Sequence, residues 1–130
     1  MTPEQIALVQ SSFKSVAPIA AQAADLFYNR LFEIAPEVRR LFPADLSGQK
    51  LKLMGMLSTA VNHLHELDTI LPTVRQLGER HRDYGVSAHH YALVGAALLW
   101  ALEQGLGSAF TPEVRTAWSA AYGTLAEAMR

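Results

Sequence analysis

The sequence predicts an all-α fold. Apolar residues recur with helical spacing along almost the whole chain, and no stretch of useful length alternates between apolar and polar residues as a strand would. Prolines, glycines and capping residues divide this pattern into about seven helices of unequal length. At 130 residues the chain is expected to form one domain, residues 1–130, around a single core.

Three helices are expected in the N-terminal part of the chain. The segment Thr2-Pro3-Glu4-Gln5 supplies an N-cap, a proline at the first helical position and a capping-box glutamine, and the helix that it starts should end near Pro18. A second helix carries residues 26–32 and should end before Pro36, because the residue ahead of a proline is pushed out of helical geometry. Pro36 can then begin a short helix that ends at Leu41.

A turn-rich connection over residues 42–48 precedes the fourth helix. Ser47 is expected to cap this helix, which should run from Gln49 to about His65. Residues at helical spacing share one of its faces, namely Gln49, Leu53, Leu57, Ala60 and Leu64.

Three more helices follow. The helix that contains His81 should end at Gly85, and Ser87 opens a longer helix that Gly105 and Gly107 are expected to stop. The segment Thr111-Pro112-Glu113 then repeats the start of the first helix. Short helices without a sustained heptad do not resemble a four-helix bundle or a coiled coil, which suggests that they fold around something.

Composition excludes several functions. Hydrophobic residues make up 50% of the chain and charged ones only 18%, so that a surplus of apolar surface is available to bury a ligand. Eleven basic and twelve acidic residues are scattered along the sequence, and nucleic acid is therefore not an expected partner. The absence of cysteine excludes disulfides, thiolate catalysis, iron–sulfur clusters and zinc–thiolate sites.

The sequence gives no sign of targeting to a membrane. Its first residues do not show a basic stretch followed by an apolar one, and no run approaches ~18 uninterrupted apolar residues. A cytoplasmic location without a signal peptide or membrane span is expected.

His81 is the main candidate for a functional residue. Val74, Leu77 and His81 lie at i, i+3 and i+7, so that an imidazole emerges from an apolar helical stripe. A neutral imidazole can donate its lone pair to iron, and haem is anchored in helical proteins in this way. Taken alone, the segment fits a buried, hydrogen-bonded core histidine better, and both interpretations stay open.

The other histidines do not predict a metal site. His63 and His65 are two residues apart, and His89 and His90 are adjacent, so that neither pair converges on one face of a helix. A dedicated zinc site is not expected.

A set of residues spread over the chain favours the interpretation of His81 as a haem ligand. These residues, in order and at their intervals, are Tyr28, Phe42, Gln49, Leu53, His81 and Tyr91. The set resembles the globins. The segments that look most like bacterial single-domain haemoglobins, and like the haem domain of flavohaemoglobins, are residues 26–32, 36–42, 78–86, 88–95 and 117–123. The resemblance covers essentially the whole chain and implies a globin fold that encloses a haem pocket.

The resemblance implies a role for each residue of the set. His81 would be the proximal ligand of haem b, Phe42 the aromatic that wedges the haem, and Tyr91 a proximal partner that orients the imidazole. Tyr28 and Gln49 would be distal residues that donate hydrogen bonds to a dioxygen ligand, whose partly superoxide-like character favours such donors. From the residues alone, Tyr28 fits a core tyrosine equally well, and Gln49 fits an exposed first-turn residue better.

The sequence evidence for further haem contacts is weaker. The residues expected in the pocket wall are Leu53, Leu57, Val86, Val94 and Leu98. Arg80 and His90 are candidates to pair with a haem propionate, although both also fit solvated surface charge.

The sequence also departs from the flavohaemoglobin pattern. Those proteins carry an acidic residue near the end of the last helix that joins the tyrosine and the proximal histidine. This sequence reaches Arg130 before that position, and Glu127 lies about two turns too early, which puts strong electron donation to iron in doubt. No Gly-rich dinucleotide fingerprint occurs either, so that electrons would have to come from a separate reductase.

Three functions follow as hypotheses. The first is reversible binding of dioxygen, nitric oxide or carbon monoxide for oxygen carriage, storage or scavenging, by a monomer or homodimer. The second is nitric oxide dioxygenation, which forms nitrate and needs a separate reductase to restore ferrous iron. The third is a haem-free sensor or interaction domain of globin-like fold, against which the presence of His81 argues.

Overall fold

The computed structural model describes all residues, Met1–Arg130, and contains helices but no strand. The α-helices are α1 (Pro3–Val16), α2 (Ala20–Ile34), α3 (Ser47–Asn62), α4 (Leu71–Asp83), α5 (Ala88–Leu106) and α6 (Pro112–Met129). Short 3₁₀ helices at Ala17–Ile19, Pro36–Leu41, Leu64–Thr69 and Gly107–Ala109 join them. The seven predicted helices correspond to these six α-helices and to the 3₁₀ helix Pro36–Leu41.

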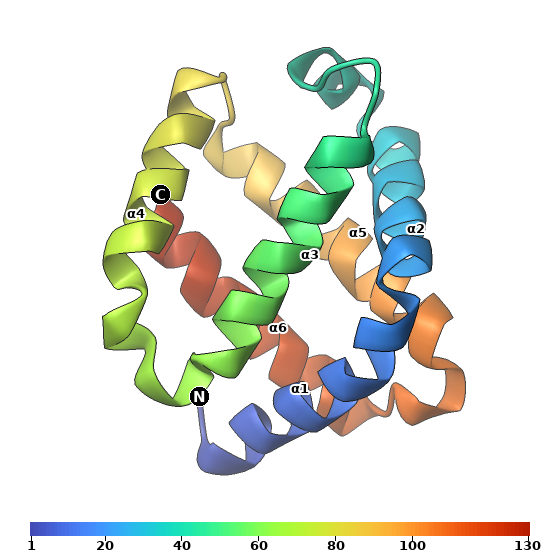
Figure 1. Ribbon diagram of the computed structural model, residues 1–130, viewed down its shortest axis with the longest axis vertical. Helices are drawn as coiled ribbons and strands as arrows, with labels where there is room; N and C mark the ends of the chain where they lie inside the picture. The colour runs from blue at the N-terminus through green and yellow to red at the C-terminus, as the bar shows by residue number, and fades with distance from the viewer.

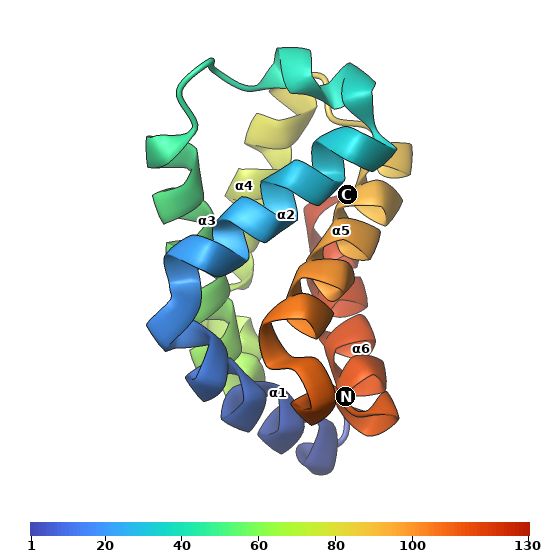
Figure 2. The same cartoon turned by 90° about the vertical axis from the view of Figure 1, so that its right-hand side faces the viewer.

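The helices cross at steep angles and do not run as a bundle (Figures 1 and 2). The most extensive contacts join α2 to α5 and α1 to α6, and α5 also packs on α1 and α6. Figure 1 shows α3 crossing in front of α5 and α6, with α4 at the edge of the molecule. The main core of 19 buried residues draws on α1, α2, α3, α5 and α6 but contains no residue of α4.

Two side-chain hydrogen bonds fix α1 on its neighbours. The Trp118 indole Nε1 donates to Ser12 Oγ at 2.9 Å, and Gln10 Nε2 donates to the carbonyl of Val61 at 3.0 Å. These bonds tie α1 to α6 and to the end of α3, and they satisfy polar groups that would otherwise be costly to bury.

Most of the predicted helix starts are confirmed. Thr2 and Gln5 form the expected capping box on α1, and Thr111 accepts the backbone N–H of Val114 at 3.2 Å. The prediction for Ser47 was wrong, because Ser47 is already helical and donates through its backbone N–H and Oγ to the Asp45 carboxylate, at 3.0 and 2.8 Å. An Asp at this position also places negative charge near the helix N-terminus, where the dipole favours it.

Two helices end at other residues than predicted. The predicted helix over residues 49–65 ends earlier, at Asn62, and its remainder belongs to the 3₁₀ helix Leu64–Thr69. Gly105 does not stop α5, which continues to Leu106 and ends at Gly107, whose φ of 56° lies in the left-handed region. Gly85, with φ of 91°, follows the end of α4 as expected.

One segment is long and apolar enough to cross a membrane by length and composition alone, Ala88–Ala109, which contains α5. The sequence expectation had not identified it. In the fold this helix supplies core residues such as Ala97, Leu98 and Ala101, and it contacts α1, α2 and α6. Packing on three neighbours accounts for part of its apolar surface.

Candidate functional site

His81 lies in the last turn of α4, with its side chain partly buried. Burial lowers the pKa of the imidazole below its usual 6.5, because desolvation disfavours the charged form. The ring is therefore neutral near pH 7 and keeps a lone pair for a metal. Its Nδ1 atom is fully buried and has no hydrogen-bond partner. A core histidine held by hydrogen bonds, the alternative suggested by its segment alone, would not leave this atom unpaired.

Tyr91 on α5 is the aromatic neighbour of His81. The two ring centroids are 6.3 Å apart and the rings are tilted by 51°. The Tyr91 hydroxyl is also buried without a hydrogen-bond partner. Desolvation raises the pKa of Tyr91, and the positive charges of Arg82 and Arg130 oppose this shift. Two unpaired polar atoms on neighbouring rings are costly in a folded protein and mark this region as a candidate functional site.

Tyr122 on α6 holds the backbone at Tyr91. Its hydroxyl donates to the Tyr91 carbonyl at 2.6 Å, and its pKa is raised by burial. A Cβ atom at Gly95 would lie 2.7 Å from the Tyr122 ring, closer than real side chains approach. Gly95 therefore allows the ring to pack against α5 and to reach Tyr91.

Tyr28 lies in a cluster of aromatic rings. It is almost fully buried on α2, and its ring meets Phe42 edge to face with centroids 5.6 Å apart. Phe32 contacts both of these rings, at 6.0 and 5.6 Å, and Phe27 packs on Tyr28 at 4.9 Å. Edge-to-face contacts of this kind hold a ring in one orientation.

Gln49, in the first turn of α3, lies beside the Tyr28 hydroxyl. Burial raises the pKa of Tyr28 to about 12, and the nearby Gln49 side chain, which can hydrogen-bond to the hydroxyl, opposes this shift. Tyr28 therefore keeps its proton across the physiological pH range and can donate it. The structure brings Tyr28, Phe42 and Gln49 together.

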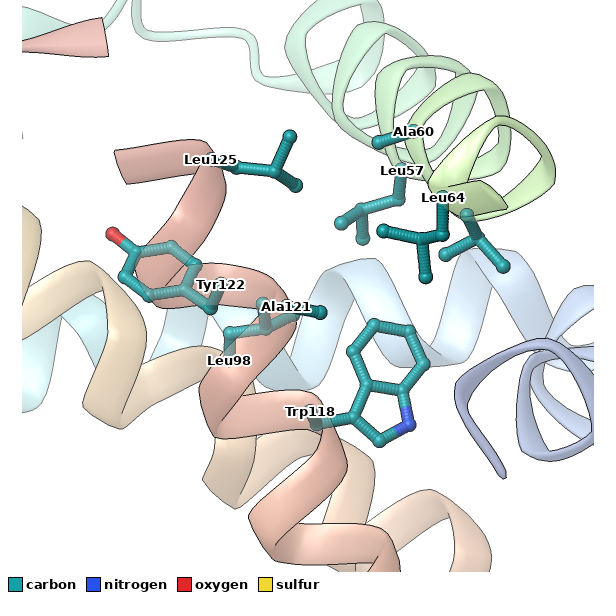
Figure 3. Close-up of a pocket in the computed structure, with 9 residues that line it drawn as sticks. Leu57, Ala60, Leu64, Leu98, Trp118, Ala121, Tyr122 and Leu125 are labelled. Atoms are coloured by element: carbon teal, nitrogen blue, oxygen red, sulfur yellow. The ribbon is translucent and has the colours of Figure 1, made fainter. Parts of the chain in front are cut away.

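The expected wall residues fall into two groups. Phe42, Leu53, Leu57, Val86 and Val94 are partly exposed, whereas Leu98 is buried. Leu57 and Leu98 also line a small apolar cavity between α3, α5 and α6 (Figure 3). Its other lining residues are Ala60, Val61, Leu64, Trp118, Ala121, Tyr122 and Leu125.

The two candidates for propionate pairing differ in their surroundings. Arg80 is exposed and makes no ion pair within the chain. His90 completes a capping box at the start of α5, where its Nδ1 accepts the backbone N–H of Ser87 at 3.0 Å. Sequence reasoning missed this structural role of His90.

His81 and the aromatic group around Tyr28 belong to two helices, α4 and α2, that do not pack closely on each other. Apart from α6 and the 3₁₀ helix Leu64–Thr69, α4 makes no extensive contact, and no ring contact joins His81 to the Tyr28 group. No three His, Cys, Asp or Glu side chains converge, so that iron would need donors from its own cofactor. A flat, apolar porphyrin that needs one protein nitrogen fits this arrangement.

Residues of α6 were missed by sequence reasoning. Trp118, Tyr122 and Leu125 form part of the apolar stripe of that helix, but a stripe does not distinguish core packing from the lining of a site. Only the helix crossings show that Tyr122 reaches Tyr91.

The lowered pKa of His81 gives a pH dependence for the haem-free protein. Because the unfolded chain takes up a proton more readily than the folded one, His81 contributes stability above pH 6.5 that is lost as the pH falls toward its folded pKa. Urea unfolding between pH 5 and 8 should show this loss in the wild type. His81→Gln should have a smaller pH slope in that window, and an unchanged slope would show that His81 does not contribute.

Comparison with protein families matches residues 25–129 to the family model described as Globin. The chain is 36% identical to the flavohemoproteins of Bacillus subtilis and Bordetella parapertussis, with 88% and 98% of the chain aligned. It spans about a third of their length, 31% and 32%.

Solved structures show the same relationship. An engineered carbene transferase, made from a proposed nitric oxide dioxygenase of Rhodothermus marinus, matches with a TM-score of 0.88 at 28% identity, over 98% of this chain and 89% of that one. A bacterial globin from Campylobacter jejuni matches with a TM-score of 0.80 at 28% identity, over 97% and 91%.

Proposed function

The chain belongs to the globin family, and we propose from this that residues 1–130 form one globin domain that holds haem b on His81 and reversibly binds dioxygen and other diatomic ligands. The observation that carries the proposal is the partly buried, neutral imidazole, whose Nδ1 is buried and unpaired, on a helix that does not pack closely on the Tyr28 group. When bound, ferrous haem supplies an iron atom that takes up a diatomic gas.

His81 is the proximal ligand in this proposal. A histidine binds a metal through one ring nitrogen, and it binds most firmly when its other ring nitrogen makes a hydrogen bond. That hydrogen bond fixes the orientation of the ring and sets its basicity. Tyr91 supplies the partner, because a small movement that joined its hydroxyl to His81 Nδ1 would satisfy both unpaired atoms at once.

Tyr28 and Gln49 act on the gas ligand. The Tyr28 hydroxyl donates a hydrogen bond to dioxygen, and Gln49 holds or shares that bond from the first turn of α3. Phe42, packed edge to face on Tyr28, fixes the direction of the hydroxyl and excludes water from one side. Leu53, Leu57, Val86, Val94 and Leu98 provide the apolar wall, and Arg80 pairs with a propionate.

Nitric oxide dioxygenation is the second candidate. The names of the similar proteins favour it, namely the flavohemoproteins and the proposed dioxygenase from Rhodothermus marinus. The reaction would need a reductase to restore ferrous iron. Repeated nitrate formation with a reductase and NADH favours the enzyme, whereas one nitrate per haem followed by arrest favours a carrier of dioxygen.

Haem should stabilise the fold. A ligand that binds only the folded state at a concentration one hundred times its Kd adds about 2.7 kcal/mol, which corresponds to roughly 10 °C in the thermal midpoint of a domain of this size. Thermal unfolding followed by circular dichroism, with and without an equivalent of haem, measures the difference. Equal midpoints, with no uptake of haem, would favour the haem-free sensor or interaction domain instead.

A further inference from the structure

The helix that carries His81 packs mainly on α6, with a smaller contact to the 3₁₀ helix Leu64–Thr69. Val74 and Gly78 are the buried residues of α4, and neither belongs to the main core. Val74 joins a small cluster with Ala60 and Ile70, to which the end of α6 contributes Leu125 and Met129. The position of His81 therefore depends on the last turns of α6, which reach α4 beside the C-terminus in Figure 1.

Gly78, three residues before His81, is the point of closest approach. A Cβ atom at this position would lie 2.0 Å from the Met129 carbonyl oxygen and 2.7 Å from its carbonyl carbon and Cα. All three neighbours are backbone atoms, which cannot move aside as the end of a side chain can. The backbones of α4 and α6 thus touch at Gly78 because no side chain lies between them.

Arg82, one residue after His81, makes the second attachment to the same residue of α6. Its guanidinium Nη1 donates to the Met129 carbonyl at 3.0 Å. Because the donor is a guanidinium, the bond is charge-assisted, and it joins two segments 47 residues apart in the sequence.

We propose that Arg82 is a positioning residue for His81, because its bond to Met129, together with the contact at Gly78, holds α4 on both sides of the imidazole. The contact at Gly78 acts as a pivot, and the Arg82 bond stops the end of α4 from rotating about it. The inference rests on the proposed function in that His81 is taken as the haem ligand. Arg82 itself need not touch the haem.

The test compares two arginines of the same helix. Arg82→Met removes the donor but keeps a long side chain with a good helix propensity. Arg75→Met is the matched control, because Arg75 is exposed on α4 and makes no hydrogen bond or ion pair. Arg82→Lys keeps the charge and can restore part of the bond. Gly78→Ala should act in the same direction through displacement of α4.

Three measurements on the reconstituted protein and one on the haem-free protein decide the outcome. Haem transfer to an acceptor protein should be roughly two- to tenfold faster in Arg82→Met than in Arg75→Met, the range expected for loss of one solvent-exposed hydrogen bond. The iron–histidine stretching band of the ferrous protein should shift or broaden, and Arg82→Lys should restore it in part. Thermal unfolding of the same variants reports any general loss of stability.

Hydrogen exchange of residues 79–86 in the haem-free protein gives a result that does not depend on iron. These amides should exchange faster in Arg82→Met than in Arg75→Met. If Arg82→Met matches Arg75→Met in exchange and in haem transfer, the proposal is wrong. An unchanged iron–histidine band together with lower thermal stability would reduce Arg82 to an ordinary stabilising contact. If the wild type takes up no haem but amide exchange of residues 79–86 is faster in Arg82→Met than in Arg75→Met, the proposed function fails, whereas the attachment of α4 through Arg82 stands.

Discussion

Replacement of His81 by alanine should remove most of the affinity of the protein for haem. Loss of a side chain that merely supports a metal ligand already lowers metal affinity roughly 10- to 100-fold, so that loss of the only protein ligand should cost more than about a hundredfold. Haem titration followed by absorption in the Soret region measures the affinity. Free imidazole, which can fill the space left by the side chain, should restore much of the spectrum.

His89→Ala is the matched control for this experiment, because His89 is an exposed histidine on α5. Its haem affinity and spectrum should equal those of the wild type. A ferrous spectrum of His81→Ala that matches the wild type without imidazole would show that another residue binds iron.

Replacement of Tyr28 by phenylalanine should accelerate the release of dioxygen about ten- to a hundredfold. A hydrogen bond to a group with charge is worth roughly 1.5–3 kcal/mol, and each 1.4 kcal/mol is about a factor of ten in rate. Carbon monoxide carries less negative charge, and its release should change less. The aromatic contacts with Phe27, Phe32 and Phe42 survive the substitution, so that the fold is preserved.

Gln49→Leu and the double variant separate the two distal side chains by stopped-flow kinetics. Gln49→Leu should have the smaller effect, and the two effects should not add because the side chains lie together. Tyr84→Phe, at a tyrosine that is 65% exposed, is the control and should release dioxygen like the wild type. If Tyr28→Phe leaves dioxygen release unchanged while Gln49→Leu accelerates it, the two roles are reversed.

The fold was predictable from the sequence to the extent that its signals are local. Thr2, Pro3 and Gln5 specify the start of α1 within one turn of chain, and the same is true of Thr111 at α6. Ser47 shows the limit, because Asp45 two residues earlier competes for the same cap and offers a charged acceptor. The outcome depends on the direction in which the chain enters the helix, which composition does not give.

The candidate site was less predictable than the fold from residue types alone. Helical spacing placed His81 on an apolar face but could not separate a ligand from a core histidine, and the resemblance to globins supplied the remaining roles. The unpaired Nδ1 atom is a property of the folded structure. Contacts between distant segments, such as Gly78 with Met129 and Tyr122 with Tyr91, depend on how helices cross and leave no pattern along the chain.

The most direct test of haem binding through His81 is the absorption spectrum of the purified protein after reconstitution with haem, recorded in the ferric and ferrous states and after addition of carbon monoxide. One haem per chain should be taken up, its pyridine derivative should be that of haem b, and the ferrous protein should give a five-coordinate spectrum that carbon monoxide shifts. A spectrum that stays that of free haem, or a ferrous form that does not respond to carbon monoxide, would contradict the assignment of a haem site at His81.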